Sequence, residues 1–408
     1  MKRITQLFTI CMIASLILTG LTSCKDDDDS TSCEDDQAST GVNNVWEEFI
    51  GTDTLVPALP DTYSNYFAYS FERTSPNMGI RINGEFASAR YMSYNLYDVE
   101  VGTSFTAILD KDMTSKECSS NHFANEEEET YNRYSVNIVP DGTDVSDLDN
   151  PMEFDGNINR LSIMIRYYVP QADKYGGVPL PSVEAFDINT GEILELPAAF
   201  NLDPTYVDID DLTDLVEPLF DLETPDVIRF YNANSGGLYP NLHNHYLAAP
   251  ITKEDNQVYM FRFRAPSFVS DDSEIGTKDV RYFSINQGGV STRNFAGLKD
   301  EDFIIGSDGF ITLVIADDEP AVRQKADGLN FMPWKVASGD MILLYRNLVI
   351  NEDFPNGTNS VPLLDKSLPP VEVIGQAGNF HIGEYAPLGL KMTKAEYLLN
   401  FGGFEVSY

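Results

Sequence analysis

Residues 89–98 read Ala-Arg-Tyr-Met-Ser-Tyr-Asn-Leu-Tyr-Asp, a long aromatic run that ends at an aspartate. Aromatic residues are enriched in β-strands, and an Asp that follows such a run is a turn signal. The beginning of the run, Ala89–Ser93, recurs as Val280-Arg281-Tyr282-Phe283-Ser284. The stretch therefore predicts a β-strand of which the chain carries a second copy.

An acidic segment follows both copies of this strand. Asp110-Lys111-Asp112-Met113 begins 20 residues after Arg90, and Asp300-Glu301-Asp302-Phe303 begins 19 residues after Arg281. These aspartates are natural ion-pair partners for the two arginines, and we expect each arginine to pair with an aspartate of its own copy. The shared order predicts two domains of similar topology, with coincidence as the alternative.

Another strand follows an Asp-Gly pair in each copy. Asp155-Gly156 precedes Ser162–Ile165, as Asp308-Gly309 precedes Thr312–Ile315. The spacing from the arginine is much longer in the first copy, and an acidic insertion at 121–149 would explain the excess. Because a slip by one residue would turn core side chains into water, we expect the two strands to superpose in register.

The rest of the chain is also rich in short β-prone runs broken by turn residues. Other strand patterns lie at 79–84, which ends in an Asn-Gly turn signal, and at 161–167, 258–264 and 340–348. Helix signals are few: a helical spacing at 209–220, and a capping box at Thr393–Glu396 that opens a short helix. The sequence predicts an all-β protein of two tandem antiparallel β-sandwich domains with a few short helices.

The N-terminus has the features of a secretory signal. Lys2 and Arg3 precede an apolar stretch, 7–18, which is too short for a comfortable membrane span of about 20 residues. The end of the signal, Leu21-Thr22-Ser23-Cys24, resembles the lipobox of bacterial lipoproteins. That resemblance implies cleavage before Cys24 and lipidation of Cys24, whereas an ordinary cleaved signal with an incidental cysteine is the alternative.

An acidic, apolar-poor segment follows the predicted cleavage site. Asp26–Asp29 close behind Cys24 resembles the surface-export signal of Bacteroidota lipoproteins, although any spacer in so acidic a chain would be acidic. Residues 24–44 cannot bury enough apolar surface to fold and are expected to form a disordered tether. We expect a lipid-anchored protein of the outer membrane that faces outward, with the membrane as partner through its lipid.

Charge and cysteine content exclude several classes of function. The chain has 64 acidic and 27 basic residues and a formal charge of -37, so a nucleic-acid partner, which needs clustered Lys and Arg, is not expected. Cys33 and Cys118 remain outside the signal and Cys24, and whether they pair stays open. No Cys-x-x-Cys, Walker, Rossmann or Gly-x-Ser-x-Gly pattern occurs, and no cofactor is implied.

Several motifs, taken in order, resemble a family of exported bacterial proteins catalogued as domains of unknown function. They are the strand at 280–284, Ser307-Asp308-Gly309, Asn330-Phe331-Met332-Pro333-Trp334, the strand 343–346, and in the first copy 89–98. Phe283 and Phe331 depart from the family, which has Trp there. The resemblance implies tandem sandwiches of jelly-roll type and no assigned activity.

The predicted organisation has five parts. They are a signal peptide at 1–23, an acidic tether at 24–44, a first β-sandwich domain at 45–200, an acidic helical connection at 201–230 and a second β-sandwich domain at 231–408.

Four residues besides Cys24 are candidates for ligand binding. His243 and His245 would share one strand face and could ligate a metal with a carboxylate, but a polar strand start that bonds backbone explains them as well, and no metal is expected. Trp334 suits stacking against a sugar, although core packing is the commoner role of aromatic residues. Arg281 is either an anion clamp or a structural partner of an aspartate.

Catalytic signatures are absent, so the sequence favours a non-catalytic binding or assembly module for a glycan or another extracellular ligand, such as a surface protein. The alternative is a hydrolase or lyase that acts on an extracellular polymer with carboxylates in the cleft between the domains. Whether the chain is an enzyme stays open, with a binding module preferred.

Overall fold

The computed structural model describes residues 45–50, 60–202, 226–233, 239–289, 294–336, 338–365 and 367–400. The signal peptide, Cys24, the acidic tether and the helix expected at 209–220 lie outside the described residues. No helix in the described ranges has both the length and the apolar character needed to cross a membrane. We call residues 45–202 the first half and residues 226–400 the second half.

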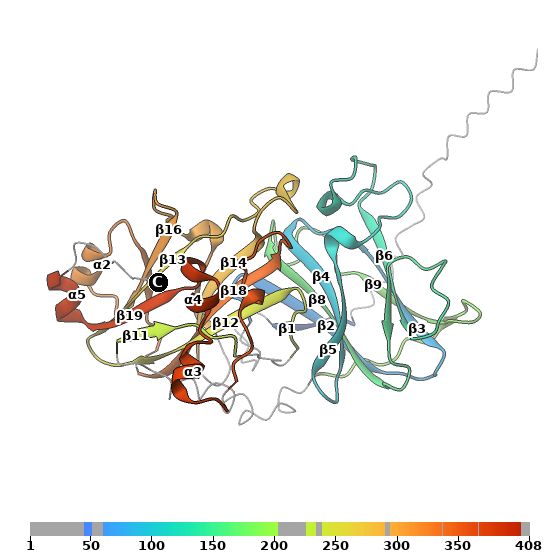
Figure 1. Cartoon of the computed structure of the whole chain (residues 1–408). Helices are drawn as coiled ribbons and strands as arrows, with labels where there is room; N and C mark the ends of the chain where they lie inside the picture. Colours follow the sequence, from blue (N-terminus) through green and yellow to red (C-terminus); the bar gives the residue numbers. More distant parts are fainter. Residues whose placement is uncertain are drawn as a thin grey trace, which may run out of the picture. The chain divides into compact units, whose positions relative to one another are not determined.

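The first half contains two five-stranded sheets among its described residues. Sheet 1A has the order β1-β2-β8-β4-β5, and sheet 1B has the order β10-β9-β3-β6-β7 (Figure 1). Their strands are β1 Glu47–Ile50, β2 Ser64–Glu72, β3 Met78–Glu85, β4 Ala89–Asp98, β5 Thr103–Leu109, β6 Arg133–Pro140, β7 Pro151–Phe154, β8 Arg160–Pro170, β9 Ser182–Asp187 and β10 Ile193–Leu194.

The second half repeats this plan. Sheet 2A has the order β12-β18-β14-β15, and sheet 2B has the order β11-β19-β13-β16-β17. Their strands are β11 Val227–Arg229, β12 Asn244–Lys253, β13 Gln257–Arg264, β14 Val280–Gly289, β15 Asn294–Lys299, β16 Phe310–Ala316, β17 Asn330–Pro333, β18 Gly339–Ile350 and β19 Leu388–Thr393.

Helices in the described ranges are short. The α-helices are α2 Pro320–Lys325, α3 Pro370–Ile374, α4 Gly378–His381 and α5 Lys394–Asn400. The 3-10 helices are η1 Asp110–Asp112, η2 His122–Ala124, η4 Asp272–Glu274, η5 Asp300–Asp302, η6 Thr358–Ser360 and η7 Gly383–Tyr385. The expected capping box is confirmed, because Thr393 N donates to Glu396 Oε2 at 2.8 Å and Glu396 N donates to Thr393 Oγ1 at 3.2 Å.

Each half has a hydrophobic core between its two sheets. In the first half Tyr94 of β4, Ile163 of β8 and Ile82 of β3 belong to one core cluster, as Phe283 and Leu313 do in the second half. Alternate residues of a strand point to opposite faces, so the other face of β4 and β8 is left for other contacts. The all-β sandwich prediction is thus confirmed, although β6–β7 and β16–β17 are parallel pairs.

The two halves share one topology, strand by strand. In sheets 1A and 2A the run β2-β8-β4-β5 corresponds to β12-β18-β14-β15, and in sheets 1B and 2B the run β9-β3-β6-β7 corresponds to β19-β13-β16-β17. Arg90 of β4 and Arg281 of β14 therefore occupy equivalent strands, as the duplication predicts. The halves nevertheless belong to one compact unit, Gln37–Tyr408. Within that unit, sheets 1A and 1B lie in the first expected domain and sheets 2A and 2B in the second.

The expected superposition of Ser162–Ile165 on Thr312–Ile315 is wrong. Ser162–Ile165 lies in β8, whose counterpart is β18, whereas Thr312–Ile315 lies in β16, whose counterpart is β6. An Asp-Gly pair is a general turn signal and carries no information about which strand follows it. The Asn-Gly turn expected at 83–84 is also wrong, since β3 continues through both residues and ends at Glu85.

A matching asparagine clamp fixes the true register of the repeat. Asn150 Nδ2 donates to the carbonyls of Thr114 and Ser135 at 2.9 and 2.7 Å. Asn330 Nδ2 donates to the carbonyls of Ile304 and Thr312 at 2.9 and 3.1 Å. These bonds make 150–154 the copy of 330–334, which places Phe154 in the position of Trp334.

Candidate functional site

Buried ion pairs join the two halves. Arg90 Nη1 lies 3.1 Å from Asp300 Oδ2, and Arg281 Nη1 lies 2.6 Å from Asp110 Oδ1. All four side chains are buried. The arginines had been expected to pair within their own halves, and that expectation is wrong, because each half supplies the carboxylate for the arginine of the other.

Hydrogen bonds hold both carboxylates in place. Asp110 accepts the backbone N–H groups of Met92 and Lys111 at 2.6 Å each, and Asp300 accepts those of Phe283 and Glu301. Burial raises the pKa of Asp110 and raises that of Asp300 to about 7, against the opposing charge of the paired arginine in each case. A buried arginine that is bonded in this way has a structural role. This favours the interpretation of Arg281 as a structural partner of an aspartate over that of an anion clamp.

Trp334 lies in the core of the second half. Its side chain is 8% exposed and meets the ring of Tyr259 edge-on, with ring centroids 5.7 Å apart. A ligand on the surface has little of this ring to stack against.

The two candidate histidines have different surroundings. His243 Nδ1 lies 2.8 Å from the hydroxyl of Tyr91, and burial together with the charge of Arg166 lowers the pKa of His243 to about 4. His245 is exposed on β12 opposite Asn347. Nowhere in the described ranges do three or more His, Cys, Asp or Glu side chains gather closely enough to hold a metal ion. Of the four candidates, Arg281 and His243 both contact Tyr91, since the guanidinium of Arg281 lies 6.0 Å from the centroid of the ring whose hydroxyl contacts His243. Trp334 lies apart from them in the core of the second half.

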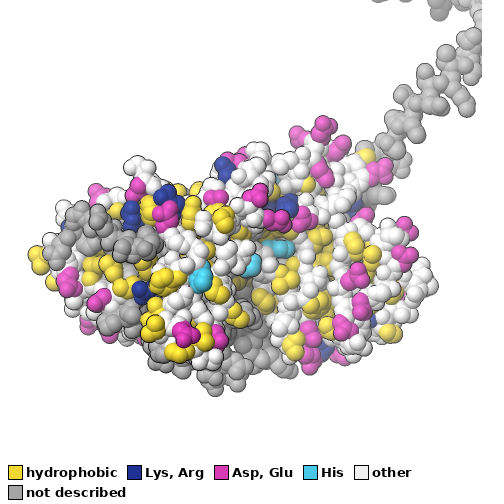
Figure 2. All heavy atoms as spheres, in the orientation of Figure 1, with side chains coloured by type: hydrophobic (Ala, Val, Ile, Leu, Met, Phe, Trp, Pro, Cys, Tyr) yellow, Lys and Arg dark blue, Asp and Glu magenta, His cyan; other side chains and the backbone are white. Residues whose placement is uncertain are grey.

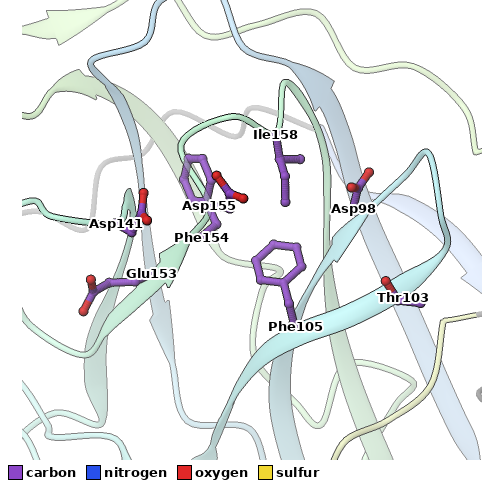
Figure 3. Close-up of a pocket in the computed structure, with 8 residues that line it drawn as sticks. All are labelled: Asp98, Thr103, Phe105, Asp141, Glu153, Phe154, Asp155 and Ile158. Carbon is purple, nitrogen blue, oxygen red and sulfur yellow. The ribbon is translucent and has the colours of Figure 1, made fainter.

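An open pocket of about 390 Å³ lies at one edge of the first half. Its walls come from the edge strands β5 and β7 of the two sheets, from the end of β4, and from the turns after β6 and β7. The lining residues are Asp98, Thr103, Phe105, Asp141, Glu153, Phe154, Asp155 and Ile158. Figure 3 shows the ring of Phe105 beside Ile158, with the carboxyl group of Asp98 on one side and those of Asp155, Asp141 and Glu153 on the other.

Local contacts keep the pocket walls in position. Arg73 donates to the carbonyls of Gly156 and Ile158 at 2.8 and 3.1 Å, and its guanidinium lies 4.8 Å from the ring centroid of Phe154. Asp141 Oδ1 accepts the N–H of Gly156 at 2.9 Å. Because Arg73 is buried and fixes the turn between β7 and β8, the pocket is shaped before any ligand arrives.

The sequence patterns do not predict this pocket. Asp141 falls in the acidic insertion expected at 121–149, and neither Asp98 nor Phe105 stands out as a candidate ligand residue. The available signal was Phe105, a lone aromatic among Thr and Ser on a strand, which the structure leaves 36% exposed. The other lining residues come from separate turns, so no short motif contains them.

The second half repeats one of the four acidic positions of the lining, because Asp318 corresponds to Asp141. At the positions equivalent to Asp98, Glu153 and Asp155 it has Gly289, Pro333 and Lys335, by the strand pairing and the asparagine clamp. The fold of the second half therefore forms without carboxylates at these three positions.

Comparison with known proteins gives information about the fold alone. No protein-family model and no curated protein matches the chain. An uncharacterised protein of Burkholderia cenocepacia is similar in structure, with a TM-score of 0.53 at 8% identity over 86% of this chain and 81% of that chain. The VPA0106 protein of Vibrio parahaemolyticus has a TM-score of 0.43 at 11% identity over 75% of this chain and 89% of its own. The first likeness shows a shared fold, and the resemblance to the exported family stays a prediction.

Proposed function

We propose that this chain is a lipid-anchored cell-surface or outer-membrane module that binds a glycan, without catalysis, in the pocket of the first half. The observation that carries the proposal is an exposed Phe105 surrounded by four carboxylates in a preformed hollow. Binding sites commonly combine an apolar surface with a few convergent polar groups. A pyranose presents an apolar C–H face to an aromatic ring, and its hydroxyls donate hydrogen bonds to carboxylate oxygens.

Charge narrows the class of glycan. The lining has four acidic residues and no Lys or Arg, and carboxylates outnumber basic side chains over the face shown in Figure 2. An anionic polysaccharide would be repelled, whereas a neutral or amine-bearing sugar would not. An amine-bearing sugar would bind more weakly at high salt, because screening weakens charge attraction at the surface.

Substitution of Phe105 by alanine is expected to weaken glycan binding by about 5- to 30-fold, since loss of one well-placed aromatic contact is worth about 1–2 kcal/mol. Asp98→Asn should weaken it as well, by removing an acceptor. Titration calorimetry of the mature chain against neutral and amine-bearing oligosaccharides measures both effects.

The matched control is Phe380→Ala, which removes an exposed phenylalanine of α4 in the second half. Binding by Phe380→Ala should equal that of the unmodified chain. Equal binding by Phe105→Ala would place the glycan elsewhere, and failure of every neutral and amine-bearing glycan to bind would refute the proposed ligand class.

Export has independent support. Cys118 is disulfide-bonded, and disulfides persist mainly outside the reducing cytosol. Lipid anchoring is supported by the lipobox-like sequence that ends at Cys24.

Replacement of Cys24 by alanine should release the protein from the membrane, because no acyl chain could then be attached. Cell fractionation with immunoblotting measures the release, and Cys33→Ala serves as the control that leaves the lipobox intact. Retention of the Cys24→Ala protein in the membrane fraction would contradict the lipid anchor, and full protection of the unmodified protein from protease on intact cells would contradict the outward orientation.

The hydrolase alternative needs carboxylates that a polymer can reach between the halves. Asp61, Asp110 and Asp300 lie there, but each is at most 3% exposed and each is paired with an arginine. The burial and pairing of these carboxylates therefore support cohesion of the halves, and the binding module remains the better-supported function.

A further inference from the structure

Arg346 of β18 has a carboxylate partner between the halves. Its Nη1 lies 3.5 Å from Asp61 Oδ2. The same Asp61 oxygen accepts the hydroxyl of Ser284 at 2.5 Å and the amide of Asn286 at 3.3 Å. Asp61 Oδ1 accepts the hydroxyl of Tyr282 at 2.9 Å. The carboxylate of Asp61 thus accepts three side-chain hydrogen bonds and also pairs with the charge of Arg346.

The equivalent position in the second half is Asn241. Asp61 Oδ1 accepts the N–H of Tyr63 at 2.9 Å, and Asn241 Oδ1 likewise accepts the N–H of His243 at 3.1 Å. Asn241 Oδ1 also accepts the hydroxyl of Tyr91, as Asp61 Oδ1 accepts that of Tyr282. The amide nitrogen of Asn241 therefore stands where Asp61 has its second oxygen.

Arg166 of β8 is the counterpart of Arg346, but no carboxylate of the described residues pairs with its charge. It is 1% exposed, and Nη2 donates to the carbonyl of Tyr239 at 2.7 Å. Nε and Nη1 have no acceptor in the described part of the chain, and neither has Nδ2 of the buried Asn241. The rings of Tyr66 and Tyr97 lie 4.8 and 5.6 Å from the guanidinium. These rings attract the cation, and Tyr97 also hydrogen-bonds the guanidinium, but Nε and Nη1 are left without an acceptor.

Buried donors without acceptors are rare because each costs free energy, and a buried charge is normally paired. We propose that a small monovalent anion of the size of chloride binds between Arg166 and Asn241 and takes the place that the second oxygen of Asp61 has in the other half. The anion neutralises Arg166 and accepts the orphaned N–H groups. It is a structural ligand that stabilises the contact between the halves.

Thermal unfolding of the mature chain tests the proposal with chloride or bromide against gluconate at equal ionic strength. A ligand that binds only the folded state raises its stability, so the midpoint should rise with halide concentration and saturate, by about 2–4 °C overall. Asn241→Asp supplies the missing carboxylate; it should raise the midpoint in gluconate and remove the response to halide. Asn189→Asp adds the same charge at an exposed position and should keep the full response.

Crystals grown with bromide locate the ion by its anomalous scattering, and the peak is expected between Arg166 and Asn241. The proposal is overturned by equal midpoints in halide and gluconate, by a halide response that persists in Asn241→Asp, or by density for water at this position without a bromide peak.

Discussion

Substitution of Arg281 by leucine is expected to lower the free energy of unfolding by about 3–5 kcal/mol, because it leaves a buried carboxylate without its cation. Arg281 and Asp110 are both at most 2% exposed, and Arg281 Nε also donates to the carbonyl of Arg90 at 2.8 Å. Since the two charges come from different halves, the loss weakens the contact between the halves. Urea unfolding followed by tryptophan and far-ultraviolet signals measures the change.

Arg323→Leu is the matched control, since Arg323 pairs with Asp318 at 2.6 Å on the surface, where both side chains are about half exposed. An exposed pair contributes about 0–1 kcal/mol, so this variant should unfold almost as the unmodified chain does. The double variant Arg281→Leu, Asp110→Asn should recover part of the loss, because the uncompensated charge is gone. Equal costs for Arg281→Leu and Arg323→Leu would show that the buried pair does not stabilise the contact.

The local parts of the fold could be predicted from the sequence because short patterns determine them. The aromatic run at 89–98 gave β4, and the capping box at Thr393 gave α5, since both depend on neighbours a few residues apart. The mostly apolar pattern at 161–167 predicted a strand, and β8 is buried on both faces, with one face in the core and Arg166 on the other.

The pairing between halves could not be predicted in the same way. The duplication identified Arg90 and Arg281 as equivalent, but the sequence contains no distance between Arg281 and Asp110, which lie 171 residues apart. Two copies of one unit that pack against each other can exchange partners, as Arg90 and Arg281 do here. The exchange is therefore a property of packing and not of either copy alone.

Sequence differences between the two copies also made part of the repeat impossible to recognise from the sequence. Asn150–Phe154 and Asn330–Trp334 share only the asparagine and the methionine, Met152 and Met332. The asparagine clamp that makes them equivalent is visible only from its bonds to distant carbonyls. The pocket was hidden for a related reason, because Asp98, Phe105 and Asp155 meet only when the edge strands of two sheets are brought together.

Acidification is expected to destabilise the protein through His243. The pKa of His243 is lowered to about 4 in the folded chain, by burial first and then by the positive charge of Arg166, whereas a histidine in the unfolded chain has a pKa of about 6.5. Between these values the unfolded chain takes up a proton that the folded chain does not. The stabilisation from neutral His243 is therefore complete above about pH 6.5 and is lost as the pH falls towards about 4, to a total of about 3 kcal/mol.

His243→Asn isolates this contribution, because asparagine can still bond the hydroxyl of Tyr91 but does not titrate. The difference in unfolding free energy between the unmodified chain and His243→Asn should shift by about 3 kcal/mol in favour of the variant between about pH 7 and pH 4. Other groups that titrate in this range are common to both chains and cancel in the comparison. His381→Asn, at an exposed position of α4, should run parallel to the unmodified chain. Parallel curves for His243→Asn as well would mean that His243 titrates alike in the folded and unfolded chains, so that its buried neighbours do not oppose its charge.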